Sequence, residues 1–123
     1  MRAHAAAAAP DEACGLLFGA GDRIDIAQPC VNVADQPRRR FEIDPTALFA
    51  ALRAERVGGS QLIGFYHSHP SGDARPSRAD AQAAAPDGRL WLILGGDDVM
   101  AWRAAADGAI NGRFDAVDLL AEG

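Results

Sequence analysis

The feature that most constrains the fold is a pair of histidines at the end of an apolar run. Residues 61–66 are mostly apolar and β-prone, and they lead directly into His67-Ser68-His69-Pro70. Side chains two positions apart on a strand point to the same face, so His67 and His69 can converge. Pro70 has no backbone N–H for a sheet ladder and should end the strand. The chain must therefore present two imidazoles where a buried strand meets a loop.

A third metal ligand follows in the next segment. The loop 70–76 leads into Ser77, which has the position of a helix N-cap, and Asp80 lies in the first helical turn. Two imidazoles and one carboxylate fill three positions of a tetrahedral zinc site and leave the fourth for water, which is the plan of a catalytic site. Taken singly, Asp80 has an alternative role as a helix-start carboxylate, and the histidines as turn or core residues. Their combination favours a metal site.

A candidate base for a metal-activated water stands near the start of the chain. Glu12 begins an apolar run, residues 12–19, that reads as a second buried strand. A carboxylate at the mouth of such a strand is costly unless it is paired, solvated or used in chemistry. The alternative for this segment is a solvated loop acid beside Asp11. Cys14 shares the face of Glu12 on a strand, and we expect it to pack as a small hydrophobe rather than line a pocket.

Together these segments resemble the JAMM (MPN-plus) zinc metalloprotease family. The resemblance rests on Glu12-Ala-Cys-Gly-Leu-Leu, His67-Ser-His-Pro and Ser77-Arg-Ala-Asp80, with Arg40-Phe-Glu-Ile-Asp-Pro45 similar to the segment that enters the family's central helix. It implies one zinc ion per chain, bound by His67, His69 and Asp80. It also implies Glu12 as general base and acid. Ser77 matches the serine that helps to stabilise the oxyanion.

The resemblance also implies a substrate class. The chain is most similar to compact prokaryotic members that resemble the sulfur-carrier-protein cysteine peptidase. It would hydrolyse the bond after the C-terminal Gly-Gly of a small ubiquitin-like or sulfur carrier protein, using a zinc-activated water. Two alternatives remain. Residues 69–80 also resemble a loop of RadC-like proteins, whose role is DNA-repair-associated or unknown, and the family has a non-catalytic MPN scaffold branch. The start at Glu12 favours the peptidase, as does Ser68 where RadC-like proteins have Asn.

Composition and charge limit the partners and the cellular location expected for the protein. The 123 residues carry a net charge of −5, and the one basic run is Arg38-Arg39-Arg40, so no nucleic acid is expected as partner. No apolar run reaches transmembrane length, so no membrane association is expected. Cys14 and Cys30 lie far apart, and no secretory signal stands out, which favours a cytoplasmic protein. The oligomeric state stays open.

The coarse order of elements predicts a single α/β domain over residues 1–123. With the resemblance, the expected fold is a JAMM/MPN-like (cytidine-deaminase-like) sandwich, a curved mixed sheet flanked by two or three helices. Asp44-Pro45 is a good helix start, and Trp91 and Trp102 are expected in the core. The expected helices are residues up to 9, 44–57 and 77–85, and the expected strands are 14–18, 23–33, 61–69, 90–94, 99–103 and 112–120.

Overall fold

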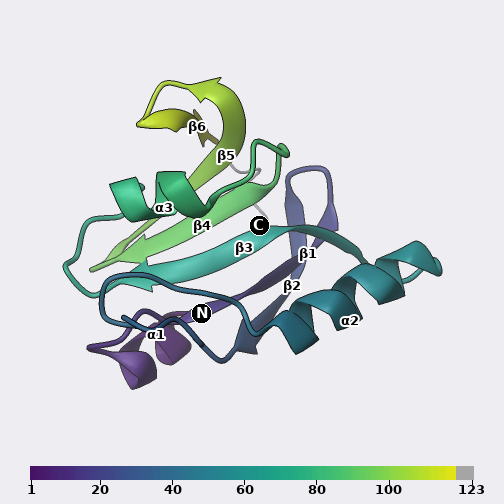
Figure 1. Ribbon diagram of the computed structural model, residues 1–123, viewed down its shortest axis with the longest axis horizontal. Helices are drawn as coiled ribbons and strands as arrows, with labels where there is room; N and C mark the ends of the chain where they lie inside the picture. The colour runs from purple at the N-terminus through teal and green to yellow at the C-terminus, as the bar shows by residue number, and fades with distance from the viewer. Residues whose placement is uncertain (119–123) are drawn as a thin grey trace.

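The computed structural model describes residues 1–118 and shows one mixed sheet with three helices (Figure 1). The sheet has six strands in the order β2-β1-β3-β4-β5-β6. The elements along the chain are α1 (Arg2–Ala8), β1 (Cys14–Ala20), β2 (Arg23–Cys30), α2 (Pro45–Arg56), β3 (Gln61–His69), α3 (Arg78–Ala83), β4 (Leu90–Gly95), β5 (Asp98–Gly108) and β6 (Gly112–Val117).

The two central strands, β3 and β4, form the parallel pair of the sheet. The other four neighbouring pairs are antiparallel. A parallel pair requires a crossover connection, which here contains α3. Every residue of β4 is buried, as expected for a strand covered on both faces. The C-terminal ends of β3 and β4 therefore meet at one edge of the sheet, beside the loop that leads into α3.

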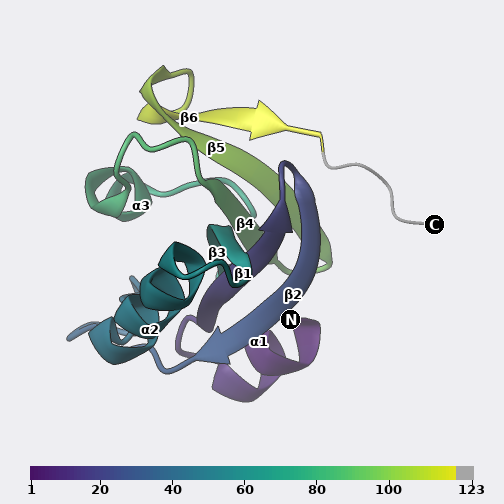
Figure 2. The same ribbon diagram turned by 90° about the vertical axis from the view of Figure 1, so that its right-hand side faces the viewer.

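The helices cover both faces of the sheet (Figure 2). α2 and α3 pack on one face, where Ala51 joins a cluster with Leu16 and Leu62. α1 lies on the opposite face, where Ala5 packs against a cluster that includes Tyr66. α2 begins as its sequence predicts, because the Asp44 carboxylate accepts a hydrogen bond from the amide of residue 46 at 3.1 Å and Pro45 occupies the first turn.

The predicted fold class is confirmed, and so is the order of elements. Trp91 and Trp102 are buried core residues, as predicted. The strand predicted to end at residue 33 ends at Cys30, and an isolated bridge between Asn32 and Ile43 follows it.

Other predicted bounds also differ from the structure, including that of the strand predicted for 14–18, which continues to Ala20. The helix predicted for 77–85 ends at Ala83, because Pro86 disfavours helical geometry in the residue before it. The strand predicted for 99–103 continues to Gly108, where pairing with β6 outweighs the low β-propensity of residues 104–106. β6 covers 112–117, and the last two residues of the predicted strand 112–120 lie outside the described residues. Among residues 1–118, no helix has the length and apolar character needed to cross a membrane.

Candidate metal centre

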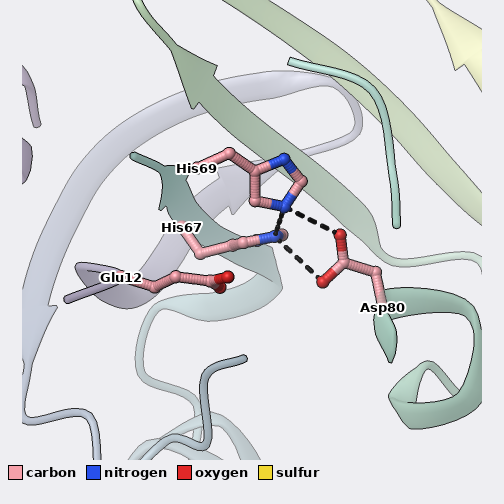
Figure 3. A group of neighbouring side chains, drawn as sticks. All are labelled: Glu12, His67, His69 and Asp80. Carbon is pink, nitrogen blue, oxygen red and sulfur yellow. Dashed lines mark hydrogen bonds and ion pairs between the residues drawn. The ribbon is translucent and has the colours of Figure 1, made fainter. Parts of the chain in front are cut away.

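Four buried polar side chains from three parts of the chain converge at the end of β3 (Figure 3). His67 and His69 come from β3, Asp80 from the first turn of α3, and Glu12 from just before β1. One ligand atom from each residue lies within 4.8 Å of the others. All four side chains are buried, with Glu12 only 4% exposed. The predicted metal ligands and the predicted base therefore form one cluster.

The distances within this cluster fit a cation better than they fit hydrogen bonds alone. The two Nε2 atoms of His67 and His69 are 3.1 Å apart, and they lie 3.1 and 3.0 Å from the two carboxylate oxygens of Asp80. Each Nε2 carries at most one proton, and a carboxylate oxygen only accepts. Protonating both Nε2 atoms to satisfy Asp80 would place two N–H groups face to face. A metal ion bound by all three residues removes this conflict.

The tautomer of His69 supports the same conclusion. Its Nδ1 lies 2.7 Å from the backbone carbonyl oxygen of Asp73, which can only accept, so Nδ1 carries a proton. In the neutral ring, Nε2 then offers its lone pair toward Asp80. A second hydrogen bond that orients a metal-binding imidazole in this way is a usual feature of protein metal sites.

The ionisation of His67 and Asp80 also suits a metal. Burial lowers the pKa of His67, so this ring is neutral at pH 7. Burial alone would raise the pKa of Asp80, but the close contacts with the imidazoles of His67 and His69 hold it well below its ordinary value. For His69, burial lowers the pKa, but the contacts with Asp80 outweigh it and raise the pKa overall, so a metal that binds this ring would displace a proton. An ionised carboxylate beside a neutral imidazole is the state in which these groups bind metals.

Glu12 is a buried carboxyl group beside the three candidate metal ligands. Burial raises the pKa of Glu12 to about 7. Its Oε1 atom is buried and has no hydrogen-bond partner among the described residues. Its backbone is held on both sides, because its N–H donates to the carbonyl of Pro37 at 2.7 Å and its C=O accepts from the Asn32 side chain at 3.0 Å. The alternative of a solvated loop acid is wrong for this residue.

Ser77 is the N-cap of α3, as predicted from the sequence. Its hydroxyl accepts from the Asp80 amide at 3.0 Å, while the Asp80 carboxylate accepts from the Ser77 amide at 2.9 Å, which is a capping box. Because the hydroxyl oxygen accepts, its own proton remains available to a further acceptor. Ser77, Glu12 and His69 line the same cavity of about 310 Å³.

The structure also reveals contacts that the sequence does not signal. The ring of Phe41 stacks on His67 with centroids 4.3 Å apart and an interplanar angle of 23°. Phe41 was part of the motif that resembles the helix entry, but no spacing rule connects it with His67. The sequence likewise does not signal the contact of the Asp73 carbonyl with His69 or that of the Asn32 side-chain amide with Glu12.

Cys14 packs in the core, as predicted. It is fully buried, pairs across the sheet with His67 and Cys30, and belongs to the cluster beneath α2. Both cysteines are free thiols. Burial raises the pKa of Cys14 to about 12, so its thiol is neutral at pH 7.

The sheet, its helices and the converging site define a JAB/MPN-type domain with a metal centre at the end of a central strand. The family model described as "Prokaryotic homologs of the JAB domain" matches residues 1–105. The chain belongs to this Prok-JAB family.

Several similar proteins carry peptidase names. The chain is 40% identical over 101 residues to the desampylase of Haloferax volcanii, and this match covers 80% of this chain and 73% of that protein. It is 38% identical over 104 residues to the probable TtuB-protein conjugate cleaving protease of Thermus thermophilus, covering 82% and 67%. It is 34% identical over 96 residues to the CysO-cysteine peptidase of Mycobacterium tuberculosis, covering 76% and 65%.

Solved structures share the fold. The solution structure of protein DSY2949 from Desulfitobacterium hafniense matches with a TM-score of 0.77 and 29% identity, covering 96% of this chain and 83% of that one. AF2198, a JAB1/MPN domain protein from Archaeoglobus fulgidus, matches with a TM-score of 0.54 and 20% identity, covering 97% and 86%. The second likeness concerns the fold alone.

Proposed function

We propose that this protein is a metal-dependent peptidase that hydrolyses the bond after the C-terminal Gly-Gly of a small ubiquitin-like or sulfur carrier protein. The observation that carries the proposal is the buried convergence of Glu12, His67, His69 and Asp80 beside a cavity. The names of the relatives from Haloferax, Thermus and Mycobacterium support the hydrolase and the kind of substrate.

The proposed cofactor is one zinc ion per chain, bound by His67, His69 and Asp80. Two imidazoles and a carboxylate are a common ligand set for catalytic zinc, and they leave one position for solvent. When bound, zinc would act as a Lewis acid and lower the pKa of a coordinated water to about 7.

The proposed role of Glu12 is proton transfer. Its carboxylate takes a proton from the attacking water, whose oxygen bonds to the carbonyl carbon of the terminal glycine. The same carboxyl group then gives this proton to the leaving nitrogen as the C–N bond breaks. The products are a carrier with a free glycine carboxylate and an amine. A pKa of about 7 suits a group that must both accept and donate at neutral pH, and such catalysis contributes roughly 10²–10⁴-fold.

The proposed role of Ser77 is to donate a hydrogen bond to the carbonyl oxygen as negative charge develops on it. One such donor is worth about 3–4 kcal/mol in the transition state. Asp73 and Phe41 would hold the rings of His69 and His67 in place. We place the reaction in the cytoplasm as part of the same proposal, which the two free thiols support.

The first test is cleavage of a sulfur carrier protein extended past its Gly-Gly end, measured by intact mass. Zinc-loaded wild type is compared with chelator-treated wild type and with Glu12→Gln, and Asp11→Asn serves as the matched acidic control. We expect cleavage by zinc-loaded wild type and by Asp11→Asn alone, with a free diglycine end. Stoichiometric zinc without cleavage of any carrier would favour the RadC-like alternative. Absence of both zinc and cleavage would favour the scaffold.

A further inference from the structure

Two arginines with no assigned role line the same cavity as the proposed catalytic residues. Arg38 and Arg39 are exposed, and they share the cavity of about 310 Å³ with Glu12, His69 and Ser77. Within residues 1–118, neither arginine forms an ion pair with an acidic side chain. Their guanidinium groups are therefore available to a ligand that enters the cavity.

The loop that carries these arginines is held against Glu12 by a dense set of hydrogen bonds. Pro37, directly before Arg38, accepts from the Glu12 amide at 2.7 Å. The Asn32 side-chain amide donates to the carbonyls of Glu12 and Arg40, both at 3.0 Å. Its oxygen accepts from the amides of residues 34 and 42, at 3.0 and 3.1 Å. These hydrogen bonds hold the backbone around Arg38 and Arg39 close to Glu12, the residue proposed to transfer the proton.

The remaining charges around the cavity leave it positive. Two acidic residues line it, Glu12 and Asp73. Glu12 is buried, and Asp73 pairs with Arg75 through contacts of 3.2 and 3.3 Å. Arg38 and Arg39 are therefore exposed positive charges of the lining without an ion-pair partner among residues 1–118, although the protein as a whole has a net charge of −5. An anionic group is the complementary ligand.

We propose that Arg38 and Arg39 bind the α-carboxylate of the leaving group, so that the enzyme prefers carriers that end in a free amino acid after Gly-Gly. This specificity rests on the proposed function. In such a conjugate, the leaving nitrogen is bonded to the carbon that bears the carboxylate. The negative charge therefore enters the same cavity as the reacting bond. The planar guanidinium fork of arginine matches a carboxylate in charge and geometry.

The same reasoning predicts discrimination against isopeptide conjugates. When the carrier is attached to a lysine side chain, four methylene groups follow the leaving nitrogen and no carboxylate lies near it. The arginines would then gain no partner. A cavity near 310 Å³ is at the small end of ligand sites and suits one amino acid.

The test compares two carriers that differ only in their last group: Gly-Gly-Ala with a free carboxylate and Gly-Gly-Ala with a C-terminal amide. We expect zinc-loaded wild type to cleave the acid with a kcat/KM about tenfold or more above that of the amide, the effect of one good charged contact. The double variant Arg38→Gln, Arg39→Gln should bring this ratio close to one by slowing only the acid. Arg38→Lys, Arg39→Lys should keep part of the preference. Arg56→Gln, at the exposed end of α2, is the control and should leave the ratio unchanged.

A binding measurement separates this inference from the proposed function. Titration calorimetry of the acid and amide carriers with zinc-loaded Glu12→Gln, with and without the arginine substitutions, requires no turnover. Failure of wild type to cleave either carrier would count against the proposed function, while the ratio of affinities would still decide the role of the arginines. Equal affinity for acid and amide would overturn the inference. An acid preference that survives the loss of both arginines would show that another group binds the carboxylate, and it would overturn the inference as well.

Discussion

At the scale of single residues, the ionised carboxylate of Glu12 lowers the free energy of unfolding. A buried carboxyl group with an unpartnered oxygen is disfavoured when ionised. Burial raises the pKa of Glu12 from 4.5 in the unfolded chain to about 7 in the folded protein. Between these pH values the folded protein holds a proton that the unfolded chain has released. The contribution of the protonated Glu12 to the free energy of unfolding is therefore complete below pH 4.5 and is lost as the pH rises through 7.

Replacing Glu12 with glutamine should stabilise the metal-free protein. Below about pH 4.5, wild type and Glu12→Gln should be equally stable, because the carboxyl group is protonated in both states. Above pH 7 the variant should gain of the order of 1–3 kcal/mol, since each unit of raised pKa corresponds to about 1.4 kcal/mol. Denaturant unfolding with chelator from pH 4 to 8 measures this difference, with Asp11→Asn as control. A less stable Glu12→Gln at pH 8 would contradict the argument.

Phe41 should influence metal affinity without touching the metal. The Nδ1 atom of His67 has no hydrogen-bond partner among the described residues, so packing against Phe41 and Trp91 orients this ring. Loss of such support typically costs roughly 10–100-fold in metal affinity. We expect Phe41→Leu to weaken zinc binding by about tenfold in competition with a chelating dye. Phe49→Leu, at a side chain 62% exposed, is the matched control. Equal zinc affinity in both variants would rule out this role.

At the scale of elements, the site depends on how closely the loop after β3 approaches the end of β4. Gly95 permits this approach, because a Cβ there would lie 2.5 Å from the amide nitrogen of Ala74 and 2.5 Å from the carbonyl carbon of Asp73. The carbonyl oxygen of Asp73 accepts a hydrogen bond from the Nδ1–H of His69. A side chain at residue 95 would therefore displace the group that orients one metal ligand.

Gly95→Ala should lower both stability and zinc affinity. The steric overlap should cost about 1–3 kcal/mol in unfolding free energy, and zinc binding should weaken about tenfold with the loss of His69 orientation. Gly108→Ala is the control, since its Cβ would lie 2.3 Å from the Phe114 amide in a hairpin away from the site. The control should lose stability and keep its zinc affinity. A Gly95→Ala protein with wild-type zinc affinity would show that the loop does not set the geometry of His69.

At the scale of the whole molecule, the metal would join the central strand to the helix that follows it. His67 and His69 lie at the end of β3, and Asp80 begins α3. We propose that residues 1–123 form one domain, so unfolding should show a single cooperative transition. Because zinc would bind only the folded state, free zinc at 100 times its Kd should add about 2.7 kcal/mol. Scanning calorimetry should detect the higher Tm in wild type and not in Asp80→Asn. An equal shift in both would place the zinc elsewhere.

Much of the site could be predicted because its parts obey local rules. The two histidines share a face because strand side chains alternate, and the Ser77–Asp80 capping box follows from a spacing of three residues. The α2 start at Asp44 follows from cap chemistry between neighbours. The grouping of these parts with Glu12 was predicted from a resemblance to a family, because no local rule joins residues 12 and 67.

The sequence by itself determined the elements that bear the ligands, since their geometry depends on residues within a few positions of one another. Only the tertiary structure decided which distant groups complete the site: the ring of Phe41 on His67, the Asp73 carbonyl at His69, and the Asn32 amide at Glu12. It also decided the length of β5, which continues because β6 pairs with it. These contacts depend on how the sheet and its loops pack, and packing sums many weak interactions between residues far apart in the chain.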